Sequence, residues 1–294
     1  MPFFYRDETQ DLNEFARKEA SGSFLQLSDG FTHYELSNPD APETVVLVHG
    51  FSVPYFIFDP TFEFLTQSGL RVLRYDLFGR GYSDRPEAQY NIDLFVRQLR
   101  ELLDGVGARR PVHLVGLSTG GPISAVFTEQ YPERVDKLVL IDPVGAKPFA
   151  LGRALKLMAM PFVGETIISL LGIGGMTRIS SSEAGIRLHA DQILPGYITQ
   201  MRYKGFKRAI LSTIRNDMLG SFIETYEHIG KMNKPVLLFW GPQDHTVPFK
   251  HSEVLCKVMP NLQFCAIEHA GHIPHYEKPA EVNPILLEFL RAER

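Results

Sequence analysis

A serine lies between two glycines in the segment 116–120, which reads Gly-Leu-Ser-Thr-Gly. An apolar run precedes this segment and a helical pattern follows it, which predicts that Ser118 occupies a sharp turn from a strand into a helix. Such a turn strains the backbone, and glycines on both sides let neighbouring chain segments pass. It also directs the amides at the helix start toward any anion that forms there. The spacing therefore predicts a nucleophilic serine; the alternative is a glycine-rich turn with an incidental serine.

A serine hydroxyl is a weak nucleophile until a base removes its proton, and that base needs an acid to orient it. In chains with this type of turn, the order along the sequence is serine, acid and then histidine. Asp244 follows one predicted strand and His272 follows the next. Both would lie at the carboxyl ends of strands, where open α/β sheets place their sites. The three residues together predict nucleophilic catalysis by Ser118, with His272 as the base and Asp244 as the acid.

The elements that must position these residues are short runs rich in Val, Leu and Ile. Six such runs read as strands buried on both faces, at 44–50, 71–77, 112–117, 137–142, 236–241 and 262–268. Helical patterns alternate with them at 92–103, 122–133, 252–259 and 282–291. This alternation predicts an α/β fold with a mostly parallel sheet flanked by helices. Two earlier runs, 24–27 and 33–36, predict an antiparallel hairpin on one edge.

The alternation stops within residues 144–229, where we find no convincing strand. Helical patterns fill this segment, and we expect breaks between them at 172–175 and 194–196. The segment carries a net charge of +4, whereas the remainder of the chain carries −8. We therefore predict a core domain formed by residues 1–143 and 230–294, with an inserted all-helical domain between them.

Composition excludes several classes of protein. The 294 residues are 44% hydrophobic, so neither a disordered nor a fibrous protein is expected. The 30 Lys and Arg against 34 Asp and Glu give a net charge of −4, without the basic field that binding of nucleic acid requires. Two cysteines, Cys256 and Cys265, can form neither a disulfide framework nor a zinc cluster, and we expect buried free thiols. No metal or organic cofactor is predicted.

We also predict no transmembrane segment. The most apolar stretch, 151–176, is interrupted by charged residues and a proline, which a spanning helix would not tolerate. Residues 1–8 turn acidic before an apolar region can form, so they do not read as a signal peptide. A cytoplasmic location is the default expectation, and an exported protein whose leader has been removed stays open as the alternative.

Several motifs together resemble the α/β-hydrolase fold superfamily. They are the segment 116–120, the run 49–51 (His-Gly-Phe), the run 76–83 (Asp-Leu-Phe-Gly-Arg-Gly-Tyr-Ser), and the surroundings of Asp244 and His272. The resemblance extends from about residue 24 to the C-terminus. It implies that the helical insertion corresponds to the cap domain of that superfamily, and that no cofactor is needed.

The resemblance also implies a role for each site residue. Ser118 would be the nucleophile, Asp244 the acid and His272 the base. The backbone N–H groups of Phe51 and Thr119 would form the oxyanion hole, where two fixed donors can each lower the barrier by about 3 kcal/mol.

Other candidates for these roles remain. Asp142 also ends a predicted strand, where some members of the superfamily carry their acid, but the surroundings of Asp244 match the motif more fully. His269 and His275 are expected at the rim of the site or in loops, because only His272 follows the glycine that the family pattern requires.

Four further polar residues receive supporting roles in this interpretation. His49 is expected to anchor the loop that carries Phe51. Asp76 and Arg80 are expected to hold the same loop in place, and His245 is expected at the surface.

These features predict a serine hydrolase, of the carboxylesterase or monoacylglycerol-lipase type, that cleaves carboxylic esters with a hydrophobic acyl or alcohol part. Its expected partner is a small hydrophobic ester, and its expected state is a monomer or a weak homo-oligomer. Haloalkane dehalogenases and epoxide hydrolases resemble this fold but carry Asp at the position of Ser118, which argues against both. Hydrolases of carbon–carbon bonds, cofactor-free perhydrolases and a non-catalytic binding protein derived from a hydrolase remain as alternatives.

Two features of the insertion are open to a second interpretation. The basic run Arg202, Lys204, Lys207 and Arg208 is expected to be a solvated helix face, with contact to an anionic substrate or a lipid headgroup as the alternative. The apolar segment 158–176 is expected to pack mostly between cap and core, and part of it could line an acyl pocket.

Overall fold

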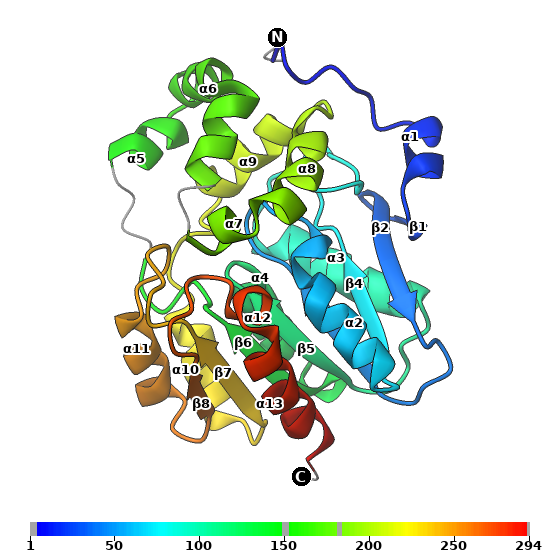
Figure 1. The fold of residues 1–294 in the computed structure, drawn as a ribbon, viewed down its shortest axis with the longest axis vertical. Helices are drawn as coiled ribbons and strands as arrows, with labels where there is room; N and C mark the ends of the chain where they lie inside the picture. The colour runs from blue at the N-terminus through cyan, green and yellow to red at the C-terminus, as the bar shows by residue number, and fades with distance from the viewer. Residues whose placement is uncertain (1–4, 149–152, 181–183, 293–294) are drawn as a thin grey trace.

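A computed structural model describes residues 5–148, 153–180 and 184–292 of the chain (Figure 1). Eight strands form one sheet in the order β1-β2-β4-β3-β5-β6-β7-β8. The pairings of β2 with β1 and with β4 are antiparallel, and the remaining pairings are parallel. The predicted α/β fold with a mostly parallel sheet is therefore confirmed.

The strands match the predicted runs to within a few residues, and the predicted edge hairpin is confirmed as β1 and β2. The strands are β1 (Ser23–Leu27), β2 (Gly30–Ser37), β3 (Thr44–Val48), β4 (Arg71–Tyr75), β5 (Val112–Leu117), β6 (Val135–Ile141), β7 (Val236–Trp240) and β8 (Gln263–Ala266). The helices that precede or flank the sheet are α1 (Glu14–Glu19), α2 (Asp59–Gln67), α3 (Ile92–Gly105), α4 (Gly120–Gln130), α11 (Lys250–Val258), α12 (Pro274–Glu277) and α13 (Pro279–Arg291). Between β6 and β7 lie α5 (Arg153–Ala159), α6 (Val163–Ser180), α7 (Ala184–Leu188), α8 (Ala190–Met201), α9 (Phe206–Arg215) and α10 (Ile223–Lys231).

The central strands are buried on both faces, as their unbroken apolar sequences predict. Every residue of β3, β5 and β7 is buried. Val46 and Val48 of β3 belong to a core that includes α3, α4 and α11, whereas Val45 and Leu47 belong to a second core that includes α13. The sheet is thus covered by a layer of helices on each face.

Helices α5 to α9 gather at the top of Figure 1, beyond the end of the sheet. Helix α10, in contrast, lies beside α4, where the Thr225 hydroxyl donates a hydrogen bond to Glu129 at 2.7 Å. The expected break at 172–175 appears as a kink in α6 at Gly172, where φ is 58°. The expected break at 194–196 is wrong, because α8 continues through Pro195 with Ile193 and Tyr197 buried on its inner side.

Within the residues that the structure describes, no helix combines the length and the apolar character that crossing a bilayer would require. This agrees with the prediction made for the apolar stretch of the insertion, apart from residues 151 and 152, which lie outside the described part.

Residues 5–11, here called the N-terminal strap, lie against the inserted helices (Figure 1). The buried Glu8 carboxylate accepts hydrogen bonds from the amides of Gly205 at 2.7 Å and Lys207 at 2.6 Å, at the start of α9. Asp7 pairs with the Lys207 ammonium. A carboxylate at a helix N-terminus is favoured both by the free N–H groups and by the helix dipole. The strap therefore caps α9 from a distant part of the chain.

These contacts correct the interpretation of the basic run as a solvated helix face. Lys207 is fully buried, and Arg208 donates hydrogen bonds to the carbonyls of Arg85 and Pro86. The exposed members are Arg202 and Lys204.

Candidate active site

Ser118 lies at the turn from β5 into α4, as predicted. Its φ of 53° is in the left-handed region, which is strained for a residue with a side chain. Hydrogen bonds hold it there: its N–H donates to the Ile141 carbonyl at 3.0 Å, and its carbonyl accepts from Gly121 at 3.0 Å. Gly120 packs so closely on β3 that a Cβ there would lie 2.1 Å from the Val48 carbonyl oxygen. The serine is therefore fixed at the end of the sheet by its strand, its helix and a glycine that no larger residue could replace.

The structure brings Asp244 and His272 together. One carboxylate oxygen of Asp244 accepts a hydrogen bond from His272 Nδ1 at 2.7 Å. Its other oxygen accepts from the amides of Thr246 at 2.7 Å and Val247 at 2.8 Å. These bonds fix the carboxylate, and donation from Nδ1 leaves Nε2 as the ring nitrogen that can take up a proton.

Asp142, the alternative acid, lies directly beside this pair. Oxygens of the two carboxyl groups and a ring nitrogen of His272 all lie within 4.8 Å of one another. One Asp142 oxygen accepts from the Gly241 amide at 3.0 Å. Complete burial and the charge of Asp244 raise the pKa of Asp142 well above 3.8. The raised pKa favours the protonated form of Asp142, and the bond to Nδ1 favours Asp244 as the acid.

The segment that follows β3 approaches the serine from the other side. A Cβ at Gly50 would lie 3.1 Å from the Ser118 Cβ. His49 anchors the segment, because its Nδ1 bonds the Gly50 carbonyl at 2.8 Å and its Nε2 accepts from the Leu77 amide at 2.9 Å. Burial lowers the pKa of His49 to about 4, so the ring stays neutral. The anchoring role expected for His49 is confirmed.

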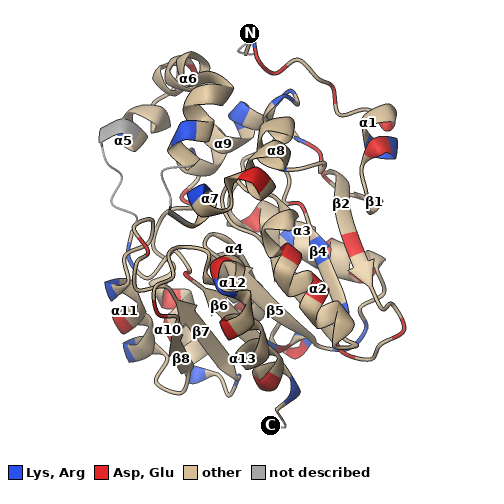
Figure 2. Ribbon diagram, viewed as in Figure 1, with Lys and Arg blue, Asp and Glu red and all other residues tan. Residues whose placement is uncertain are grey.

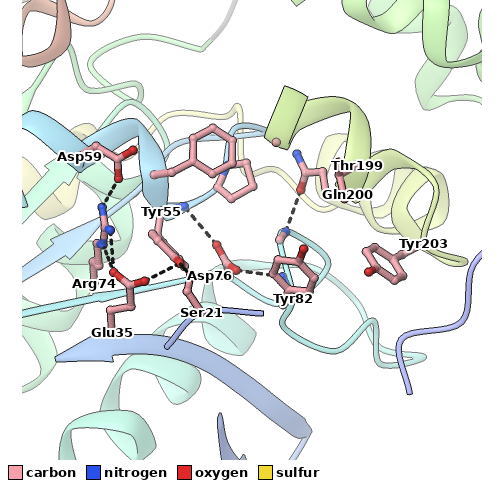
Figure 3. Close-up of a pocket in the computed structure, with 14 residues that line it drawn as sticks. Ser21, Glu35, Tyr55, Asp59, Arg74, Asp76, Tyr82, Thr199, Gln200 and Tyr203 are labelled. Carbon is pink, nitrogen blue, oxygen red and sulfur yellow. Dashed lines mark hydrogen bonds and ion pairs between the residues drawn. The ribbon is translucent and has the colours of Figure 1, made fainter. Parts of the chain in front are cut away.

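Asp76 and Arg80 hold the same segment, as expected. Arg80 Nε donates to the Phe51 carbonyl at 2.8 Å, while another of its nitrogens donates to the Thr213 hydroxyl of α9 at 2.9 Å. Asp76 accepts from the Tyr55 amide at 3.1 Å, a bond drawn in Figure 3. The segment is therefore tied both to the core and to the inserted helices.

The amides predicted to form an oxyanion hole belong to Phe51 and Thr119. Thr119 precedes the first residue of α4, and its φ and ψ are −67° and −19°. Within the described part of the chain, neither amide donates to another backbone carbonyl. Both are therefore available as donors, and their role stays a prediction.

Ser118 and His272 line one cavity of about 340 Å³. Most of its wall is apolar, and the described lining contains no Lys, Arg, Asp or Glu. Core and inserted helices both contribute to it: Gly50, Phe51, Ser52, Val53, Ile57, Leu117, Ser118, Ile179, Ser180, Ile186, His245, Thr246, His272 and Ile273. The cavity suits a small neutral ligand with apolar parts.

The other histidines differ in part from expectation. His269 is exposed in its loop, as expected. His245 is exposed but also lines the cavity, which the sequence did not indicate. His275 is fully buried rather than at the rim, because it turns inward to bond the Ile57 carbonyl at 3.0 Å, and burial lowers its pKa to about 3.

Both cysteines are free, but Cys256 and Cys265 are partly exposed rather than buried. Partial desolvation raises the pKa of both thiols, so neither has the thiolate character of a nucleophile.

The fold and this arrangement define the class of protein. Residues 45–285 match the model of the family described as "Alpha/beta hydrolase family", and the chain belongs to that family. Its relatives include hydrolases of different bonds.

The chain is 27% identical over 290 residues to a 2-hydroxy-6-oxononadienedioate/2-hydroxy-6-oxononatrienedioate hydrolase of Paraburkholderia phymatum, covering 92% of this chain and 96% of that protein. It is 23% identical over 261 residues to human monoacylglycerol lipase ABHD6, covering 86% and 76%. Among solved structures, a bromoperoxidase from Bacillus anthracis superposes with a TM-score of 0.79 at 23% identity, covering 92% of this chain and 100% of the other. That likeness supports the fold alone.

Proposed function

We propose that this hydrolase-family member is a serine hydrolase that cleaves neutral carboxylic esters with a hydrophobic acyl or alcohol part. One observation carries the proposal: a serine held at a strained strand–helix turn opens into the same apolar cavity as a histidine whose Nδ1 is bonded to a buried carboxylate. That combination supplies a nucleophile, a base and an orienting acid.

The reaction would proceed through an acyl-enzyme. His272 Nε2 takes the proton as the Ser118 hydroxyl oxygen attacks the ester carbonyl, and the amides of Phe51 and Thr119 stabilise the oxyanion that forms. The imidazolium, stabilised by Asp244, then protonates the leaving alcohol. A water molecule that gives its proton to His272 attacks the acyl-enzyme, and collapse of the second tetrahedral intermediate releases the acid and restores Ser118.

The cavity lining favours an ester over the main alternative. The substrate that names the Paraburkholderia relative is a dioate, which carries two carboxylates. Burying carboxylates requires cationic or other strong donors, and the described lining of the cavity offers no Lys or Arg. A neutral ester needs no such partner.

We further propose that residues 144–229 serve as a cap that covers the site. Ile179 of α6 and Ile186 of α7 line the same cavity as Ser118. The contacts of α10 with α4 favour a cap body formed by α5 to α9, with α10 belonging to the layer that covers the sheet.

A chain-length series of p-nitrophenyl esters, assayed with the native protein and with Ser118→Ala, tests the function. We expect serine-dependent turnover with a preference for short and medium acyl chains, because the cavity measures about 340 Å³. Absence of serine-dependent turnover on every ester would overturn the ester assignment. A dienedioate assay in parallel, monitored by loss of the dienol chromophore, would then separate carbon–carbon cleavage from a non-catalytic binding role.

A further inference from the structure

A second cavity, of about 310 Å³, lies between the core and the inserted helices (Figure 3). Tyr55 and Asp76 form its core side, and Thr199 and Tyr203 belong to or follow α8 on the cap side. It shares no lining residue with the catalytic cavity, although Tyr55 lies only two residues beyond Val53, which lines the latter. No pattern in the sequence indicates this cavity.

The ionisable groups that line this second cavity are unbalanced in charge. Three are carboxylates, of Glu35, Asp59 and Asp76, and one is a guanidinium, of Arg74. Arg74 pairs with Glu35 at 2.6 Å and with Asp59. Asp76 is 1% exposed, and outside the lining it bonds His33 Nδ1 at 2.8 Å. When His33 is protonated, these five groups retain one net negative charge, and outside the lining the Arg85 guanidinium also interacts with Asp76.

Aromatic rings contribute much of the remaining wall. Tyr82 and Tyr203 meet edge to face with ring centroids 5.8 Å apart, and Phe56 also belongs to the lining. The cavity already holds one cation against a ring, since the Arg74 guanidinium lies 4.4 Å from the centroid of Tyr55. Arg85 lies 5.5 Å from the centroid of Tyr203 without being part of the lining.

We propose that this cavity is a second binding site, and that its ligand is a small organic cation such as an alkylammonium ion. A surplus of carboxylate favours positive charge, while tyrosine and phenylalanine rings attract a weakly hydrated cation through their π faces. The amides of Tyr55 and Tyr82 hold the buried Asp76 carboxylate in place, so this wall of the cavity is preformed.

A bound cation would act on the catalytic site through a short path. Gln200 of α8 accepts from the Gly81 amide at 2.7 Å and donates to the Ser52 carbonyl at 2.7 Å. Gly81 and Gln200 line the second cavity, whereas Ser52 lines the catalytic one. A ligand in the second cavity would thus contact Gln200 of α8. Gln200 in turn bonds Ser52, next to the Phe51 amide.

Isothermal titration calorimetry with choline, and with its uncharged isostere 3,3-dimethylbutan-1-ol, tests the site. We expect choline to bind at least about tenfold more tightly, which is the size that desolvated cation–π and carboxylate attraction can supply. The titration uses Ser118→Ala protein whose state of folding is checked by circular dichroism. Binding then does not depend on any ester turnover, and failure here would leave the proposed hydrolase function untouched.

Variants locate the binding. Tyr82→Ala should weaken choline about tenfold, whereas Tyr82→Phe keeps the ring and should bind as the parent does. Asp59→Asn removes one carboxylate and should weaken binding about threefold, while Glu43→Gln removes an exposed charge outside the lining and should leave it unchanged.

Three results would each overturn the proposal. The isostere could bind as tightly as choline, or choline could fail to bind at 10 mM, which is about the limit for a useful site. The third result is an affinity that is unchanged in both Tyr82→Ala and Asp59→Asn. If Tyr82→Ala does not fold, Asp59→Asn and the isostere still decide it.

Discussion

The two cavities are similar in size, about 340 and 310 Å³, but opposite in chemistry. The described lining of the catalytic cavity is uncharged, and its carboxylate, Asp244, lies behind the histidine rather than in the wall. In the second cavity the carboxylates are themselves the wall. Residues 50–56 contribute to both. One loop therefore separates an uncharged cavity, where we propose ester cleavage, from a cavity lined by carboxylates, where we propose cation binding.

Replacing each carboxyl group by an amide tests which one orients His272, and this experiment should give the greatest loss of activity. Asp244→Asn would leave the His272 ring without its orienting acceptor, so kcat for p-nitrophenyl butyrate should fall about 10⁴-fold. Asp142→Asn leaves the bond between Asp244 and His272 Nδ1 in place and should change kcat less than about tenfold. If the Asp142 variant loses more activity than the Asp244 variant, the assignment of the acid is wrong.

A negative charge placed in the wall of the cavity at Ser118 should make this cavity favour a cationic ester over a neutral one, as is proposed for ligands of the second cavity. Ile186→Asp puts a carboxylate in the apolar wall, and kcat/KM for a hydrophobic ester should fall about 100-fold because the charge is poorly solvated there. Ile186→Asn is the matched uncharged control.

Turnover of butyrylcholine is then compared with turnover of its neutral analogue, 3,3-dimethylbutyl butyrate. The ratio of the two should be about tenfold higher in Ile186→Asp than in Ile186→Asn, because the new carboxylate attracts the choline ammonium across several ångströms. Equal ratios in the two variants would mean that the substituted side chain does not face the substrate.

The raised pKa of Asp142 predicts a pH dependence of stability. Because burial and the charge of Asp244 raise its folded pKa, the folded protein holds a proton that the unfolded chain releases near pH 3.8. Its contribution to stability is complete below that value and is lost as pH rises through the folded pKa, at up to about 1.4 kcal/mol per pH unit. Urea unfolding from pH 4 upward should show a smaller decline for Asp142→Asn. An identical slope in both proteins would contradict the raised pKa of Asp142.

The last prediction concerns the stability of the inserted helices, which line part of both cavities, and its expected change is the smallest. Glu8→Ala removes the acceptor for two amides at the start of α9 and should lower the free energy of unfolding by about 1 kcal/mol, as loss of a helix cap does. Hydrogen exchange should rise in the first turn of α9 but not in β5. Glu43→Ala, at an exposed site, provides the control. Protection lost equally in the sheet would mean that the strap stabilises the whole fold rather than the cap.

Much of the fold and the pairing of Asp244 with His272 could be predicted, because their signals are local in sequence. Buried parallel strands are unbroken apolar runs in the sequence. The glycines around Ser118 mark a tight turn, because a side chain at these positions would clash with neighbouring backbone. Asp244 and His272 each lie in the loop that follows a strand, so the order of the strands sufficed to place them at one edge.

The remaining features depend on contacts between distant residues, for which the sequence holds no signal. The second cavity joins Glu35 and Arg74 of the sheet to Tyr203 after α8. Pro195 was expected to break a helix, but buried neighbours such as Tyr197 keep α8 continuous, so that packing outweighs local preference.

The strap also has a consequence for the order of folding. The bond from Gly205 to Glu8 joins residues 197 positions apart, and closing so long a loop carries an entropic cost that local contacts do not share. During synthesis, Glu8 must wait until α9 has emerged, by which time β1 to β6 are already available to pair. The inserted helices are therefore expected to dock late, on a sheet that is already largely formed, so that the turn at Ser118 exists before the cavity around it does.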